Sequence, residues 1–432
     1  MRIVLFAHSL VSCWNHGNAH FLRGVARALM VSGHEVRVYE PANGWSAANL
    51  RADGHDAGAF ERAYPELRSV AYAPSPWRSA PVPLPRGERV GLLSPLEGEG
   101  NARCEPSEGE GSLDAALADA DAVIVHEWND PALVAAIGAH RIAGGRYTLL
   151  FHDTHHRAVS DPQAIRAFDL AGYDGVLAFG EALSEVYRRW GWGGRVHTWH
   201  EAADITLFAP PAEPAPPRAG LVWIGNWGDD ERSAELEAFL LRPAEATGLS
   251  LDIHGVRYPA HAFETLARYG ARYHGWLANA AAPGVFARHL ATVHVPRRHY
   301  VEQLAGIPTI RVFEALACGI PLMSAPWSDS EGLFRGGRDF LMLQTEAAMA
   351  AAMRDVANDV ALRASLAASG LETIRARHTC AHRAAELVAI LNTHRRPGLV
   401  PGPSSLEMPG GTKSSWAPAQ GRGDVVVLER AA

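Results

Sequence analysis

Near the N-terminus, apolar and polar positions follow each other in a way that predicts a strand, a helix and a second strand. An apolar run covers residues 2–7, and apolar positions then recur at helical spacing from Phe21 to Met30. Gly33 stands just after this pattern, where a glycine commonly ends a helix. A second β-rich run covers residues 34–40. Two strands joined by a helix form a βαβ unit, so the sheet is expected to be parallel.

The same alternation continues along most of the chain and predicts an α/β fold. Further buried strands are predicted at residues 121–127, 147–153, 175–180, 220–226, 249–255, 272–276, 292–297, 320–326 and 339–343, with helical patterns between them. A proline-rich segment separates the third and fourth of these strands. We therefore expect two doubly wound Rossmann-like domains facing across a cleft. Ligands of such sheets bind outside the carboxyl ends of the strands, which makes the cleft the expected site.

Composition divides the chain further. Residues 74–112 and 396–432 are rich in Gly and Pro and too polar to build a core, so we expect an insertion and a flexible tail without packed structure. The proline-rich segment 208–218 is typical of a stiff linker. The predicted domains are therefore 1–207, which contains the insertion, and 219–395.

Charge and cysteine content exclude several classes of protein. The 432 residues carry a formal net charge of −7, which argues against a general nucleic-acid-binding protein. Four cysteines are scattered without CxxC spacing, as expected in a reducing, cytoplasmic compartment and not in a structural zinc site. No apolar run reaches 18 residues, so no transmembrane segment is expected. The N-terminus is interpreted as a buried strand and not as a signal peptide.

A charged pair stands out in the apolar stretch 307–327. Thr309 is placed to begin a helix that runs from residue 310 to about residue 318, so Arg311 falls in its first turn. Backbone N–H groups at a helix start, together with a guanidinium, form a good cradle for a diphosphate. Glu314, one turn later, is suited to accept the two hydroxyls of a ribose. The alternative is a simple i,i+3 salt bridge, and the spacing alone leaves both open.

The pattern R-x-F-E-A-x-A-C-G-x-P at residues 311–321 resembles the nucleotide-binding motif of GT-B glycosyltransferases of the group 1 type. It looks closest to the spore-maturation (CgeB-like) branch. Residues 16–41, 126–131 and 223–226 also resemble family segments, in the family order. The resemblance implies transfer of a sugar, by a hexosyltransferase-like enzyme, from a UDP- or GDP-linked donor to a glycan, a lipid-linked sugar or a small molecule. It implies a retaining reaction without a metal or other cofactor. Because many relatives use lipid-linked acceptors, a peripheral location at the inner membrane face is a further possibility.

The resemblance also implies roles for single residues. Glu314 matches the glutamate that holds the ribose, and Gly17 matches the glycine that lets backbone approach the donor phosphates. His126 matches a histidine near the transferred sugar and is the candidate catalytic residue. His378, with His382, lies on a C-terminal helix that in this branch packs back across the domains, so a structural role is favoured for both.

Two positions depart from the family pattern. Gly306 stands where many members have a second glutamate that contacts the sugar, and Asn226 stands where many have a basic residue. Asn226 is still a candidate donor contact, because it follows the first predicted strand of the second domain. Arg232 is a candidate to supply the missing charge, as are Arg297, Arg298 and Arg311.

Aromatic and titratable residues near the predicted cleft are candidates for contact with the acceptor or the sugar. His152 and Asp153 end a predicted strand in the sequence HDTHH, where imidazole suits acid–base chemistry and Asp153 suits the base of an inverting variant. The alternatives are loop histidines bonded to backbone or a metal site. Trp128, like Trp14 and Trp45, has an aromatic face that suits sugar C–H groups, although tryptophan is also common in cores.

Sugar transfer from a nucleotide passes through an oxocarbenium-like transition state while the leaving diphosphate gains negative charge. The sequence DAD at residues 119–121 has the form of a metal-binding motif but leads into a buried strand, so arginines and helix starts are expected to stabilise that charge. Two alternatives remain: a sugar-nucleotide epimerase of the same fold, and a non-catalytic nucleotide-sugar-binding protein. An NAD-dependent dehydrogenase is disfavoured because residues 1–40 lack GxGxxG.

Overall fold

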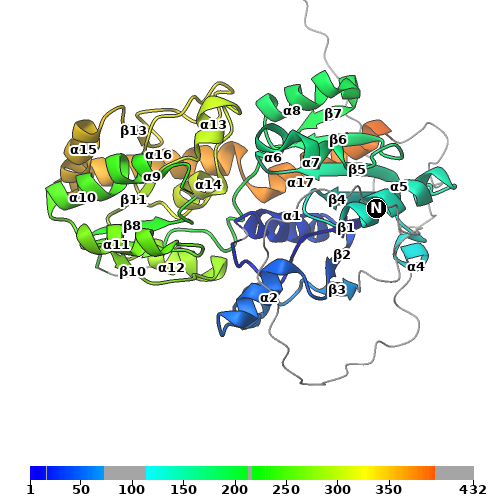
Figure 1. Cartoon of the computed structure of the whole chain (residues 1–432), viewed down its shortest axis with the longest axis horizontal. Helices are drawn as coiled ribbons and strands as arrows, with labels where there is room; N and C mark the ends of the chain where they lie inside the picture. Colours follow the sequence, from blue (N-terminus) through cyan, green and yellow to red (C-terminus); the bar gives the residue numbers. More distant parts are fainter. Residues whose placement is uncertain (16, 73–112, 213–216, 229, 395–432) are drawn as a thin grey trace, which may run out of the picture. The chain divides into compact units, whose positions relative to one another are not determined.

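Two parallel β-sheets, each with helices wound around it, make up the fold (Figure 1). The computed structural model describes residues 1–15, 17–72, 113–212, 217–228 and 230–394. The predicted insertion 74–112, the predicted tail 396–432 and part of the predicted linker lie outside the described residues. Residues 1–394 form one compact unit. We call residues 1–207 the N-terminal half and residues 217–377 the C-terminal half.

The N-terminal half is built on a seven-stranded sheet with the order β3-β2-β1-β4-β5-β6-β7, in which all neighbours are parallel. The order reverses between β1 and β4, so a crevice opens at their carboxyl ends. The strands are β1 (Arg2–Phe6), β2 (Glu35–Pro41), β3 (Ser69–Tyr72), β4 (Ala122–His126), β5 (Thr148–Asp153), β6 (Gly175–Ala178) and β7 (Val196–Thr198).

Helices connect these strands and cover the sheet (Figure 1). β4 and β5 are buried along their whole length, as expected of central strands covered on both faces. The helices are α1 (Ala19–Val31), α2 (Trp45–Ala52), α3 (Gly58–Ala63), α4 (Leu113–Leu117), α5 (Pro131–Ile142), α6 (Arg157–Ser160), α7 (Pro162–Arg166), α8 (Glu181–Tyr187), η1 (Arg188–Trp192) and η2 (Gly193–Arg195).

The C-terminal half repeats the design with a six-stranded parallel sheet in the order β10-β9-β8-β11-β12-β13. Its order reverses between β8 and β11. The strands are β8 (Leu221–Ile224), β9 (Leu251–His254), β10 (Arg272–Tyr273), β11 (Ala291–His294), β12 (Leu322–Ser324) and β13 (Leu341–Met342). The helices are α9 (Ser233–Leu236), η3 (Glu237–Leu241), α10 (Arg242–Thr247), α11 (Ala260–Arg268), η4 (Asn279–Ala281), α12 (Ala282–Phe286), α13 (Arg298–Glu302), α14 (Ile310–Ala317), α15 (Glu346–Asn358) and α16 (Val360–Arg377).

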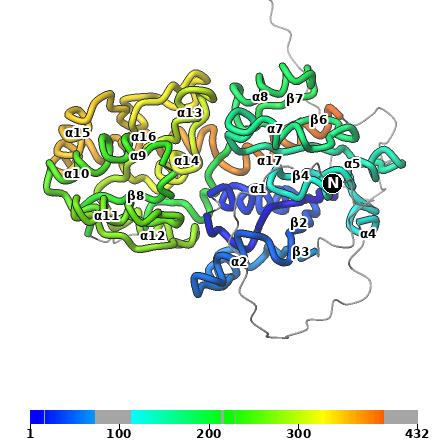
Figure 2. Tube along the Cα trace, viewed as in Figure 1, coloured from blue at the N-terminus to red at the C-terminus, as the bar shows by residue number. Residues whose placement is uncertain are grey.

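The last described helix, α17 (Cys380–His394), returns to the N-terminal half and packs against α1 (Figure 2). Gly24 makes this contact possible, because a Cβ at that position would lie 2.5 Å from the Sγ of Cys380. The indole N–H of Trp199 donates to the carbonyl of Arg383 at 2.9 Å. His378, just before α17, is buried and its Nε2 lies 2.9 Å from the carbonyl of Leu333, as expected of a structural histidine.

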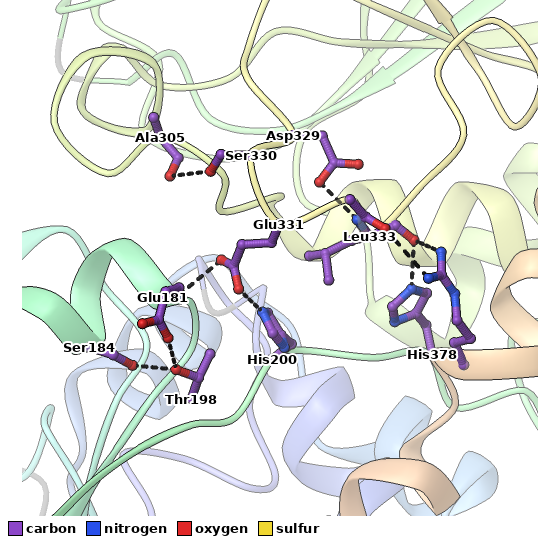
Figure 3. A network of polar contacts seen from close by, with 12 residues as sticks. Glu181, Ser184, Thr198, His200, Ala305, Asp329, Ser330, Glu331, Leu333 and His378 are labelled. Carbon is purple, nitrogen blue, oxygen red and sulfur yellow. Dashed lines mark hydrogen bonds and ion pairs between the residues drawn. The ribbon is translucent and has the colours of Figure 1, made fainter. Parts of the chain in front are cut away.

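A polar network also joins the two halves (Figure 3). The Glu331 carboxylate lies 2.7 Å from Nε2 of His200 and accepts a hydrogen bond of 2.9 Å from the backbone N–H of Glu181. Glu181 is the first residue of α8, where the helix dipole favours a negative charge. The two halves are therefore held together by charge-assisted bonds as well as by apolar contacts.

Candidate active site

A cavity of about 230 Å³ lies at the carboxyl ends of strands from both sheets. Gly17 and Thr154 line it from the loops that follow β1 and β5. Gly225 and Val295 line it from the loops that follow β8 and β11, the two strands between which the second sheet reverses its order. The site therefore lies where doubly wound sheets bind their ligands, and it is completed only when the two halves come together.

Helix α14 presents its N-terminus to this cavity. Thr309, at the N-cap position, and the first two helical residues all line the cavity. The Thr309 side chain does not cap the helix; its hydroxyl lies 3.1 Å from Nε2 of His294 instead. Gly17 faces the same helix, since a Cβ there would lie 3.2 Å from Cγ2 of Ile310. The first-turn N–H groups of an α-helix have no partner within the helix, so this arrangement suits an anion.

Arg311 links the cavity to a buried network. Arg311 lines the cavity and its guanidinium pairs with Glu314, so the i,i+3 ion pair that the sequence left open is present. Glu314 is completely buried and does not line the cavity, and its Oε1 accepts a hydrogen bond from Nδ1 of His20 at 2.9 Å. Asn279 donates to the same oxygen at 3.4 Å. The ribose-binding role of Glu314 stays a prediction, because in this structure both of its oxygens are occupied by protein groups.

His20 and Glu314 connect the two halves across 294 positions of sequence. The backbone N–H of Asp204 donates to Nε2 of His20 at 2.7 Å, so Nδ1 carries the proton that is donated to Glu314. Burial raises the pKa of Glu314, but the charge of Arg311 and the bond from His20 outweigh it and hold that pKa below its ordinary value. Glu314 is therefore ionised and its network is satisfied.

The other predicted donor residues also reach the cavity. Asn226 lines it and donates from its amide to Oδ1 of Asn15 at 2.9 Å, a contact between the two halves. Arg232 lines it too, and its guanidinium donates to the carbonyls of Val295 at 2.6 Å and of Asn226 at 2.7 Å. Arg297 lines the same wall and pairs with Glu231 at 2.8 Å. Three arginines thus line one cavity, and two of them, Arg297 and Arg311, are paired with carboxylates.

His126 and His152 lie beside this cavity and line a smaller one of about 30 Å³. Asn18 and Thr154 line both cavities, so the two are neighbours. Burial lowers the pKa of His126 to about 3, and its Nε2 lies 3.0 Å from Oγ1 of Thr154. Burial also lowers the pKa of His152 well below its ordinary value. Both imidazoles are therefore neutral at physiological pH, and the catalytic role of His126 stays a prediction.

Asp153 and Trp128 line neither cavity. Asp153 is completely buried and accepts a hydrogen bond of 2.7 Å from the Tyr187 hydroxyl, so it is not placed to act as a base on a ligand in the larger cavity. Trp128 is 39% exposed, and the Arg157 guanidinium lies 3.9 Å from the centre of its ring. Its contact with a sugar or an acceptor stays a prediction.

The structure adds three cavity residues that the sequence did not single out: Glu201, His294 and Tyr300. His155, which belongs to the predicted cluster HDTHH, lines the same cavity. His155 follows a predicted strand, so its position at the sheet edge was available from the sequence, whereas His294 lies inside the predicted strand 292–297 and is the last residue of the shorter β11. Glu201 had no such signal, because it lies in an irregular segment after β7.

Within the residues that the structure describes, no three His, Cys, Asp or Glu side chains are grouped so that they could hold a metal ion. None of the described helices is long and apolar enough to cross a membrane.

Comparison with known proteins supports the same fold. Residues 232–389 match a family described as glycosyl transferase-like. Sucrose-phosphate synthase from Thermosynechococcus elongatus is similar in structure, with 15% identity, a TM-score of 0.59 and coverage of 91% of this chain and 99% of that one. No curated protein matches the chain in sequence.

Two further structures were solved with nucleotide ligands. HepE from Anabaena, in complex with UDP and glucose, matches with 12% identity, a TM-score of 0.59 and coverage of 91% of this chain and 100% of that one. The β-glucosyltransferase of phage T4, in complex with UDP-glucose, matches with 11% identity, a TM-score of 0.52 and coverage of 91% and 98%. These similarities show that the chain has the GT-B fold, so the predicted fold of two Rossmann-like domains is confirmed. The CgeB-like branch stays a prediction.

Proposed function

We propose that the protein is a glycosyltransferase that binds a nucleotide-sugar donor, UDP-linked, in the cavity between its two halves and transfers the sugar to an acceptor. The observation that carries this proposal is the N-terminus of α14, which faces the cavity together with Arg311. The matched family region contains this helix, and structural neighbours were solved with UDP or UDP-glucose.

The diphosphate is placed at the start of α14 in this proposal. Backbone N–H groups and a guanidinium stabilise the oxygens that gain charge as the sugar–phosphate bond breaks. Arg232 and Arg297 line the same cavity and add positive potential. Much of their hydrogen-bonding capacity is directed at protein groups, which holds the guanidinium planes in place before a ligand arrives. This preorganisation is what the leaving group requires, and in the proposal it replaces a metal ion.

The acceptor binds at the carboxyl edge of the N-terminal sheet in the proposal, where the smaller cavity adjoins the larger one. A neutral His126 there is able to form a hydrogen bond with an acceptor hydroxyl. The retaining outcome is carried by the family resemblance alone. Identifying the anomer of the product by NMR would decide it.

A thermal-shift titration with UDP, GDP, dTDP, ADP and NAD tests the donor site. We expect UDP to raise the melting temperature, because a ligand that binds only the folded state stabilises it by about 2.7 kcal/mol at 100 times its Kd. Arg311→Ala should weaken UDP binding at least about tenfold, through the loss of a charge-assisted contact. Arg354→Ala is the matched control, since Arg354 is exposed on α15 and lies outside the cavity. A protein that no diphosphate stabilises would contradict the proposal.

Turnover then separates the related activities. With UDP-glucose, a transferase releases UDP faster when an acceptor is present and forms a new glycoside. An epimerase changes the sugar without an acceptor, and a binding protein shows a thermal shift but no product. Activity that persists in EDTA would support the metal-independent form of the proposal.

A further inference from the structure

One acidic side chain in the cavity has no structural explanation. Glu201 follows β7, is only 2% exposed and lines the larger cavity. Its Oε1 is buried and has no hydrogen-bond partner among the described residues. A buried polar group without a partner costs free energy, and native proteins keep few of them. Such a group on the wall of a binding cavity indicates a partner that arrives with the ligand.

Glu314, the acid near Glu201, has hydrogen-bond partners for both of its carboxylate oxygens. Glu314 has Arg311, His20 and Asn279 as partners for its two oxygens. Glu314 does not line the cavity, whereas Glu201 does. Of these two acids, only Glu201 is therefore placed to meet a ligand.

The surroundings of Glu201 also favour its protonated form. Burial, and then the nearby Glu314 charge, raise the pKa of Glu201 well above its ordinary value. This shift favours the neutral carboxylic acid, which has one O–H donor and free acceptor capacity. A sugar hydroxyl likewise donates and accepts, so the two groups match in both directions. A diphosphate oxygen only accepts, and the arginines on the cavity wall suit it better.

We propose that Glu201 binds a hydroxyl group of the nucleotide-sugar donor through its carboxyl group. This inference rests on the proposed function, because it takes the donor to be bound in this cavity. The hydroxyl belongs either to the ribose or to the transferred sugar, and the two sources share the same chemistry. Glu201 is thus a substrate-positioning residue from the N-terminal half, while α14 and Arg311 hold the diphosphate from the C-terminal half.

The test compares three substitutions at this position by calorimetric titration with UDP, 2′-deoxy-UDP and UDP-glucose. Glu201→Met keeps the side-chain volume but removes both hydrogen-bonding functions, and Glu201→Ala is the second variant if the first does not fold. Glu201→Gln keeps one donor and one acceptor and serves as the rescue. Glu264→Ala, on the exposed surface of α11, is the matched control.

We expect Glu201→Met to weaken UDP-glucose binding at least tenfold, with most of the affinity restored in Glu201→Gln. If the ligand is the ribose, Glu201→Met should weaken UDP binding by the same factor as UDP-glucose binding. The wild type should then bind 2′-deoxy-UDP more weakly than UDP. If the transferred sugar is the ligand, UDP binding is unchanged. Without ligand, Glu201→Met should melt at the same or a higher temperature, because it removes an unsatisfied acid; a purely structural residue would lower it.

Two failures are distinguishable. If wild type binds UDP and UDP-glucose and Glu201→Met binds both equally well, the role of Glu201 is refuted while the donor site stands. If wild type binds neither ligand, the proposed function fails and this inference fails with it.

Discussion

Removing the charge of Glu314 should destabilise the folded protein measurably, and the structure gives the size of the effect. Glu314 is completely buried, whereas the side chain of its partner Arg311 is 27% exposed. Truncation by Glu314→Ala leaves Arg311 able to turn toward water but leaves the Nδ1–H of His20 buried without an acceptor. Breaking a buried ion pair costs about 3–5 kcal/mol, and the exposure of Arg311 places this case near ~3 kcal/mol.

Glu314→Gln separates the charge from the hydrogen bonds. The amide oxygen still accepts the bond from His20, but the attraction to Arg311 is lost. A hydrogen bond to a charged group contributes roughly 1.5–3 kcal/mol and a neutral one about 1 kcal/mol, so we expect a loss of about 1–2 kcal/mol. Since Arg311 and His20 hold the pKa of Glu314 below its ordinary 4.5, the stability gained from the charge is present above that pH. The gap between wild type and Glu314→Gln should therefore narrow as the pH falls below 4.5.

Urea unfolding followed by circular dichroism measures both losses. Glu372→Ala is the control, because Glu372 makes a surface ion pair with Arg335 at 69% side-chain exposure and such pairs contribute at most about 1 kcal/mol. A loss for Glu314→Ala no larger than that of the control would refute the network as a source of stability. Equal losses for the Ala and Gln variants would refute the contribution of the His20 bond.

Three further predictions concern other parts of the fold. Glu331→Gln removes the negative charge from the bonds to His200 and to the start of α8, and should lower the free energy of unfolding by roughly 1–2 kcal/mol. The expected signs are a lower urea midpoint and faster proteolysis, and no change in either would show that this contact does not hold the halves together. Gly172→Ala places a Cβ 2.2 Å from the carbonyl oxygen of Gly138, so two backbone segments must separate and we expect a melting temperature lowered by an overpacking cost of about 1–3 kcal/mol; unchanged melting would contradict the packing described. Burial raises the pKa of Asp153 from 3.8 to about 7. Between these two pH values the unfolded chain loses the Asp153 proton more readily than the folded protein does, so the free energy of unfolding falls as the pH rises. Asp153→Asn should therefore gain stability relative to wild type by up to roughly 1.4 kcal/mol per pH unit in that window, and an equal difference in urea midpoint at pH 5 and pH 7 would count against it.

The central strands were predictable because a strand that is buried on both faces has a continuous run of apolar residues. All five residues of β4 are buried, and the first four, residues 122–125, form an unbroken apolar run in the sequence. The edge strands β3 and β7 were not predicted. Two of the four residues of β3 are exposed, and β7 has only three residues, so neither has an apolar run long enough to recognise.

The sequence predicted those site residues that lie at the ends of predicted strands and helices. Gly17, Asn226 and Arg311 were expected at strand or helix ends, and these ends meet at the cavity. Spacing could not show that His20 would occupy an oxygen of Glu314 from 294 residues away. Spacing could not single out Glu201 either. Its importance comes from a buried carboxylate oxygen without a hydrogen-bond partner, which only the folded structure reveals.

The return of α17 to α1 has a consequence for the order in which the protein is made. The residues that cover α1 lie at the far end of the described chain, and the Sγ of Cys380 contacts the Phe21 carbonyl across 359 positions. A ribosome therefore completes the strands of both sheets before the N-terminal half can bury this helix. Until then the part of α1 that α17 covers is exposed, and contacts so distant in sequence form slowly. We infer that a nascent chain ending at the linker is a target for chaperones and cannot complete its fold.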